Sequence, residues 1–221
     1  MADRPRRTPG RRRNHRRTLA REPGVSRLLP RRSFLASPLL VACSKKRVAE
    51  LPVLGALPEL PLTDQEGQVR RLQDYRGKLL LVAFFFTRCP SVCPRLIARM
   101  QEMERALAQG SRPFHLAAIS VDPEHDTPEV LRGYASARGI RAESFSLLTG
   151  DHSQIARAAE ENFKIGLEGS YDPDKPGLGI THGSHVILVD RESRIRAFVR
   201  TFDDDAVRAL LGYVEALESP S

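Results

Sequence analysis

Phe84-Phe85-Phe86-Thr87-Arg88-Cys89-Pro90-Ser91-Val92-Cys93-Pro94 is the stretch of sequence that decides the fold of this chain. In it an apolar run, residues 79–86, ends abruptly at two cysteines four positions apart, each followed by proline. The run has the length of a central strand that is buried on both faces. Four residues are about one helical turn, so a helix that begins after the strand places both sulfurs near its N-terminus, where the amide dipoles favour thiolates.

Cys89 and Cys93 have three residues between them, whereas the redox motif of thioredoxin-like proteins has two. Two neighbouring thiolates suit Cu(I), and an added imidazole would complete a copper site and help to hold Cu(II). A structural zinc site normally takes four protein ligands. The spacing therefore favours copper ligation over dithiol exchange, and dithiol exchange over a structural disulfide.

Strands and helices alternate on both sides of this junction. We expect strands at residues 60–64, 68–72, 79–86, 114–121, 144–148, 186–189 and 195–199, and helices after the cysteines, from Thr127-Pro128, from Asp151 to about Asn162, and at 203–217. The first two strands flank Glu66-Gly67 as a hairpin. This order predicts an α/β, thioredoxin-like fold with a mixed central sheet, an N-terminal β-hairpin extension and a terminal hairpin plus helix.

The positive charge of the chain is concentrated at its N-terminus. Residues 1–42 contain 12 Arg, no Lys and two acidic residues, so their net charge is +10, and the formal total of +8 leaves −2 for residues 43–221. The basic character therefore gives no indication that the folded part binds nucleic acid. The length of 221 residues allows one domain of ordinary size with extensions.

The leader has the features of an export signal. Arg31-Arg32-Ser33-Phe34-Leu35 is a twin-arginine pattern, and Leu40-Val41-Ala42-Cys43 resembles a lipobox. The apolar run between them is too short, with Pro38 inside it, for a permanent membrane-spanning helix. We expect residues 1–42 to be a lipoprotein signal, Cys43 to be lipidated, and residues 43–57 to link the domain to the extracytoplasmic face of the cell membrane, in the bacterial cell envelope. An Arg-rich tail that precedes a buried cysteine is the alternative.

These motifs together resemble the Sco/SenC family of copper-binding proteins over about residues 53–217. Residues 87–94 are similar to the family's Thr-x-Cys-Pro-x-x-Cys-Pro motif, 120–128 to its second block and 148–150 to its third. His182 stands six residues before Leu188, as the family's ligand histidine stands before its Leu-x-Asp strand.

The resemblance implies a thioredoxin-like domain, residues 58–218, that binds one copper ion, Cu(I) or Cu(II), through Cys89, Cys93 and His182. It also implies a role in metallating the dinuclear copper centre of a haem-copper respiratory oxidase. The implied partners are the copper-centre subunit of that oxidase, a copper donor protein and a thiol reductant.

Two positions depart from the family pattern, and a second histidine competes for the role of ligand. Thr181 and Ser91 stand where the family commonly has Asp, which puts the copper affinity in question rather than the ligation. His185 lies three residues beyond His182, and in an extended segment the two side chains point to opposite faces, so at most one of them meets the sulfurs. The resemblance favours His182.

An extracytoplasmic thiol-disulfide reductase that acts on cuproprotein cysteines, with Cys89 and Cys93 as its redox pair, is the alternative function. Thioredoxin-like reductases usually place a cis-proline before the hairpin strand, and residues 180–185 contain no proline. Asp122 and Asp126 are assigned to loop geometry and helix capping rather than to acid–base catalysis.

Overall fold

The structure of the protein is a computed structural model that describes residues 51–165 and 184–218. The candidate lipidation site Cys43 and the candidate ligand His182 lie outside these ranges. The elements are β1 (Gly55–Ala56), β2 (Pro61–Asp64), β3 (Val69–Arg71), the 3-10 helix η1 (Leu72–Tyr75), β4 (Leu79–Phe85), α1 (Val92–Leu107), β5 (Phe114–Ser120), α2 (Pro128–Arg138), β6 (Phe145–Gly150), α3 (His152–Glu161), β7 (His185–Val189), β8 (Arg194–Arg200) and α4 (Asp204–Glu218).

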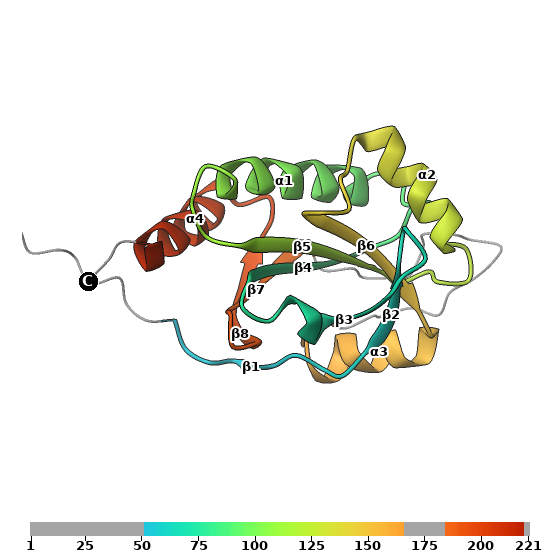
Figure 1. Ribbon diagram of the computed structural model, residues 1–221, viewed down its shortest axis with the longest axis horizontal. Helices are drawn as coiled ribbons and strands as arrows, with labels where there is room; N and C mark the ends of the chain where they lie inside the picture. The colour runs from blue at the N-terminus through green and yellow to red at the C-terminus, as the bar shows by residue number, and fades with distance from the viewer. Residues whose placement is uncertain (1–50, 166–183, 219–221) are drawn as a thin grey trace, which may run out of the picture. The chain divides into compact units, whose positions relative to one another are not determined.

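One mixed sheet organises these elements (Figure 1), in the order β1-β8-β7-β4-β5-β6-β2-β3. Strands β4, β5 and β6 are parallel, and all other pairings are antiparallel. The predicted thioredoxin-like α/β fold, with its N-terminal β2–β3 hairpin and its terminal β7–β8 hairpin and helix, is confirmed. Because β7 runs antiparallel to β4, it begins at the sheet edge where β4 and β5 end.

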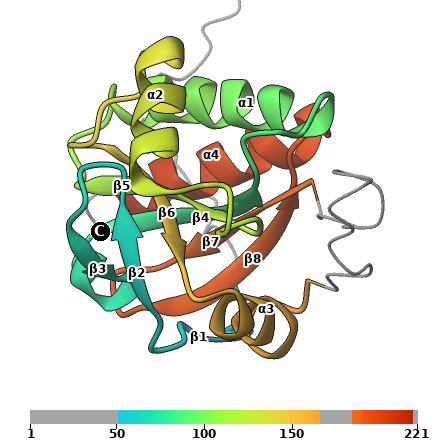
Figure 2. The ribbon, with the colours of Figure 1, turned by 90° about the vertical axis from the view of Figure 1, so that its right-hand side faces the viewer.

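Strand β4 forms the centre of the core because each of its seven residues is buried. Successive side chains of a strand point to opposite faces. Phe84 accordingly meets the edge of Phe163, just after α3, with ring centroids 5.3 Å apart, and Phe85 meets Tyr134 of α2 at 5.7 Å. Helices α1 and α4 cover the same face as α2, and α3 covers the opposite face (Figures 1 and 2).

Helix boundaries follow the capping residues that the sequence indicates. The hydroxyl of Thr127 accepts a hydrogen bond from the Val130 N–H at 3.4 Å, and Pro128 begins α2. Gly139 ends that helix with a φ of 63°, a left-handed conformation that glycine adopts without strain. The carboxylate of Asp151 caps α3 by accepting from the Gln154 N–H at 2.9 Å. These N-caps were expected.

The sheet begins earlier in the chain than the sequence indicated. Gly55–Ala56, which we placed within the 43–57 linker, is the edge strand β1 and pairs with Ile195 and Arg194 of β8. The buried Arg196 donates a hydrogen bond to the carbonyl of Leu51, which fixes the preceding segment as well. A strand of two residues, such as β1, is too short to show hydrophobic alternation, so sequence patterns do not reveal it. Within residues 51–165 and 184–218, no helix is long and apolar enough to cross a membrane.

His115 lies buried in β5 and is expected to make the domain sensitive to acid. Its ring stacks on Tyr75 with centroids 4.1 Å apart, and its Nε2 lies 2.8 Å from Ser146 Oγ. Burial, with the nearby charges of Lys78 and Arg70, lowers the pKa of His115 to about 4. In the unfolded chain His115 binds a proton below about pH 6.5, whereas in the folded domain it stays neutral down to about pH 4. The free energy of unfolding therefore falls as the pH is lowered from about 6.5 to about 4.

The free energy of unfolding should drop by roughly 2–3 kcal/mol across that interval through His115 alone. Urea titrations at several pH values measure how steeply the free energy of unfolding depends on pH. We expect His115→Gln to make this dependence weaker. His152→Gln, a change at an exposed residue at the start of α3, should leave it unchanged. An unaltered slope in His115→Gln would show that another group carries the acid sensitivity.

Candidate metal centre

The two cysteines lie between the end of β4 and the first turn of α1. Cys89 is in the connecting loop with 5% of its surface exposed, and Cys93 is in the helix and fully buried. Both are free thiols. The prediction that both sulfurs gather at the N-terminus of a helix is confirmed, although Cys89 precedes the helix, which begins at Val92.

The sulfur of Cys89 takes the place of a capping side chain. Ser91 is the N-cap residue of α1, but its hydroxyl makes no capping hydrogen bond. The Cys93 N–H donates instead to Cys89 Sγ at 3.3 Å. Burial opposes ionisation of Cys89, but the backbone N–H groups of Cys93, Ser91 and Val92 outweigh it, so the pKa of Cys89 is lowered. A helix N-terminus thus stabilises one thiolate at this position.

Cys93 has the opposite environment. Burial raises the pKa of its thiol, and the neighbouring Cys89 raises it further. The pair therefore consists of one thiol whose ionisation the helix N-terminus favours and one whose ionisation burial opposes. A soft cation that binds both sulfurs has to displace the proton of Cys93, and the charge of the cation stabilises the thiolate that results.

Two aspartates of the β5–α2 loop support the residues just before Cys89. The carboxylate of Asp126 accepts hydrogen bonds from the backbone N–H of Thr87 at 3.0 Å, from the Thr87 hydroxyl and from the Ser120 hydroxyl. Arg88 forms an ion pair with the buried Asp122 at 2.7 Å. We assigned these aspartates to loop geometry and helix capping. The cap of α2 is Thr127, and the two carboxylates hold the cysteine loop.

A signal for this support is present in the sequence. Residues 79–86 and 114–121 read as successive strands joined by one helix, a connection that usually makes them parallel neighbours. The carboxyl ends of parallel strands meet at one edge of the sheet, so the loops after them come together. Asp122 and Asp126 follow one strand, and Thr87 and Arg88 follow the other.

The register of β7 places His185 on the face away from α1. Val82 of β4 pairs with Ile187, and continuing that antiparallel register by two residues sets His185 opposite Phe84. Directly opposed side chains point to the same face. Phe84 points to the face that α3 covers, where it meets Phe163. His185 therefore points away from the face that carries Cys93.

The described residues place no third ligand beside the two cysteines. Within residues 51–165 and 184–218, no three side chains of His, Cys, Asp or Glu come together in a way that could hold a metal. His182 precedes β7 by three residues, and β7 begins at the sheet edge where β4 ends. The structure thus brings the two cysteines together, and His182 stays a prediction.

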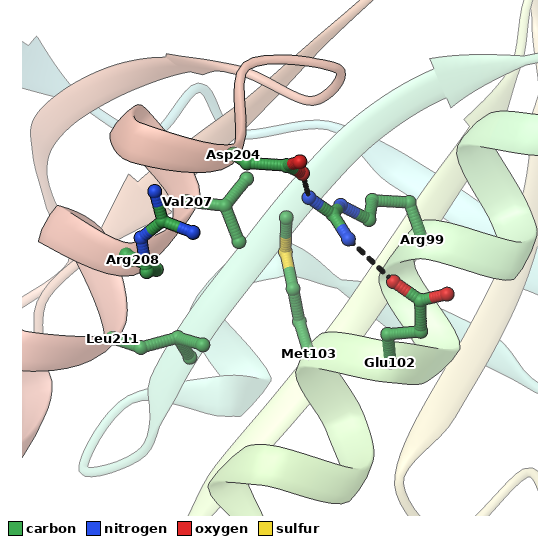
Figure 3. Close-up of a pocket in the computed structure, with 7 residues that line it drawn as sticks. All are labelled: Arg99, Glu102, Met103, Asp204, Val207, Arg208 and Leu211. Carbon is green, nitrogen blue, oxygen red and sulfur yellow. Dashed lines mark hydrogen bonds and ion pairs between the residues drawn. The ribbon is translucent and has the colours of Figure 1, made fainter. Parts of the chain in front are cut away.

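A separate groove between α1 and α4 has no ligand set of its own (Figure 3). Arg99 of α1 joins the two helices through its ion pair with Asp204 of α4, and it also pairs with Glu102 of its own helix. Its Nε donates to the Thr201 carbonyl at 3.2 Å. Met103, Val207, Arg208 and Leu211 complete the lining. Among the described residues that line this groove, the Met103 thioether is the single soft donor, and none is a cysteine or histidine.

The chain is similar to proteins of one family. The family model described as SCO1/SenC matches residues 57–213. The SCO2-like protein RT0576 of Rickettsia typhi is 33% identical over 135 residues, which cover 60% of this chain and 64% of that protein. The chain thus aligns with less than two thirds of the length of this relative.

Two solved structures share the architecture. Bradyrhizobium japonicum ScoI with copper bound has a TM-score of 0.58 and 27% identity, and the match covers 72% of this chain and 99% of that one. BsSco, described as a member of the Sco family of cytochrome c oxidase assembly proteins with a disulfide switch, has a TM-score of 0.67 and 21% identity, with coverage of 78% and 99%.

Proposed function

Since the chain belongs to the SCO1/SenC family, we propose that it is a membrane-tethered, extracytoplasmic copper chaperone. It binds one copper ion through Cys89, Cys93 and His182 and helps to metallate the dinuclear copper centre of a haem-copper respiratory oxidase. The observation that carries the proposal is the position of Cys89 Sγ at the N-terminus of α1, where the Cys93 N–H donates to it.

The donor set fits copper. Two adjacent sulfurs are the ligands that Cu(I) prefers, and an imidazole from the segment before β7 extends the site to Cu(II). The lowered pKa of Cys89 favours its thiolate, which is the form that binds a metal. Cys93, whose pKa is raised, gives up its proton as the ion binds.

Transfer is a better use of this site than storage. Cys89 lies in a loop beside Pro90 and Ser91, which are both exposed, so the site is close to the protein surface. Three protein ligands leave a coordination position open to a ligand from a partner. A recipient that approaches this loop therefore takes over the copper ion stepwise, without the domain unfolding.

A thiol-disulfide reductase is the second candidate, and one observation favours it. The pairing of a low-pKa thiol with a buried thiol that keeps its proton is also the arrangement that dithiol oxidoreductases use. Against it stands the spacing of three residues between the cysteines, where thioredoxin-like enzymes have two.

A transfer assay separates the two functions. Copper-loaded protein is mixed with the copper-free copper-centre domain of the oxidase subunit, and absorption of the dinuclear centre is followed. We expect the centre to form, and we expect the copper-free dithiol to reduce insulin slowly. Failure to form the centre, together with rapid reduction of insulin, would favour the reductase.

The membrane tether is tested separately. If Cys43 is the lipidated residue, Cys43→Ala should move the protein from the membrane fraction to the soluble fraction of the cell envelope and leave copper binding by the purified protein unchanged. Membrane association that persists in Cys43→Ala would contradict the lipoprotein assignment.

A further inference from the structure

Asp126 lies fully buried beneath the cysteine loop and connects three segments of the chain. Its carboxylate accepts from Thr87 in the β4–α1 loop and from Ser120 at the end of β5. Its own backbone N–H donates to the Asp122 carbonyl at 2.9 Å, and the next residue, Thr127, caps α2. One side chain thus fixes the position of the cysteine loop relative to a strand end and a helix start.

Such an arrangement is unusual for a carboxylate that is fully buried. The donors that reach Asp126 from Thr87 and Ser120 are neutral N–H and O–H groups. Burial of a charged group is costly unless its hydrogen bonds are satisfied, and an apolar or amide side chain avoids the cost. A carboxylate buried at this cost at the base of the cysteine loop points to a role in holding that loop.

Thr87 is the residue through which Asp126 acts. It donates twice to this carboxylate, through its backbone N–H and its hydroxyl, so both its backbone and its side chain are fixed. Thr87 lies two residues before Cys89, whose N–H donates to the Phe86 carbonyl. Thr87 is therefore held at both its backbone and its side chain two residues before the sulfur that caps α1, and the next residue, Arg88, is held by its ion pair with Asp122.

We propose that Asp126 is the positioning residue of the metal centre: through Thr87 it holds the β4–α1 loop so that Cys89 Sγ lies at the N-terminus of α1 next to Cys93. This inference rests on the proposed copper function for its effect on metal affinity. The effect on the loop itself is a property of the copper-free protein.

Asp126→Asn tests the proposal against a matched control, Asp64→Asn. Asp64 is also buried, accepts from the Glu66 and Gln68 N–H groups at 2.9 and 2.8 Å, and pairs with Arg70. It belongs to β2, which is separated from β4 by two strands of the sheet. Both substitutions replace a buried carboxylate by an amide, so they share the general cost in stability and differ in their distance from the cysteines.

Three measurements on the full chain give the result. Competition with a Cu(I) chelator should show affinity reduced about 10- to 100-fold in Asp126→Asn, the usual cost of losing an outer-shell partner, and unchanged in Asp64→Asn. In the copper-free protein, amide hydrogen exchange at Thr87 and Cys93 should accelerate about tenfold or more in Asp126→Asn only. Urea titration reports the loss of stability common to both variants.

Thr87→Val provides a milder variant if Asp126→Asn folds poorly. It removes the hydroxyl and leaves the backbone hydrogen bond, so we expect a smaller loss of affinity than in Asp126→Asn. In the double variant the two losses should not add, because both remove the same contact.

Equal copper affinity and equal exchange of the loop in the two aspartate variants would overturn the proposal. Wild-type protein that binds no copper would refute the proposed function instead. In that case hydrogen exchange alone decides the inference: faster exchange confined to the loop in Asp126→Asn supports it, and unchanged exchange overturns it.

Discussion

Replacing Cys93 with serine is expected to abolish stoichiometric copper binding. The Cys93 side chain is fully buried beside Cys89. A copper ion that contacts its sulfur is therefore bound inside the site and not loosely at the protein surface. A serine hydroxyl is a hard, neutral donor that does not substitute for thiolate on Cu(I). The sulfur-to-copper(II) charge-transfer band should disappear, and affinity should fall by more than the roughly 10–100-fold that an outer-shell change costs.

Cys89→Ser should lose copper in the same way, because it removes the readily ionised thiol. Ser91→Ala is the matched control: the residue lies between the cysteines, but its hydroxyl makes no capping hydrogen bond, so copper binding should not change. Copper titration followed by absorption spectroscopy measures all three variants. Retention of the charge-transfer band in Cys93→Ser would show that the ion is held elsewhere.

Phe84→Ala should produce a large loss of stability. The ring is fully buried at the centre of the sheet and packs edge-on against Phe163. Truncating a buried phenylalanine leaves a cavity and typically costs about 3–5 kcal/mol. That is a large part of the roughly 5–15 kcal/mol that stabilises an ordinary domain, so urea titration at low temperature is the appropriate measurement.

Val69→Ala gives the comparison for that experiment. Val69 belongs to β3 at the edge of the sheet, and 69% of its surface is exposed, so its loss should change stability by less than about 0.5 kcal/mol. If Phe84→Ala cost no more than Val69→Ala, the description of β4 as the centre of the core would be wrong.

Local signals predicted much of the fold because they act over a few residues. The continuous apolar run 79–86 identified β4, and Thr127, Pro128 and Asp151 marked helix starts that the structure confirms. Strand β1 was missed because Gly55–Ala56 is held by pairing with β8, about 140 residues later, and has no pattern of its own.

In the candidate site, too, some residues could be predicted from the sequence and others could not. The cysteine pair stands out in the sequence because two unusual residues occur at helical spacing. The role of Asp126 is harder to predict: the strand order indicates that the loops after β4 and β5 meet, but the contact with Thr87, 39 positions earlier, is seen only in the structure. The capping role of Cys89 Sγ also needs coordinates, since Ser91 is the residue that sequence rules would choose as the cap.

The choice between the two histidines depends on the same kind of long-range information. Sequence alone says that His182 and His185 cannot both meet the sulfurs. The β4–β7 register adds that His185 shares the face of Phe84, away from α1, which favours His182 as the ligand, and that assignment stays a prediction.

Copper stoichiometry and spectra of His182→Ala and His185→Ala, measured side by side with the wild-type chain, test the central claim most directly. We expect one copper per chain and a charge-transfer band in wild-type protein, retention of both in His185→Ala, and loss or severe weakening of both in His182→Ala. Binding of wild-type strength in His182→Ala, with failure in His185→Ala, would contradict it.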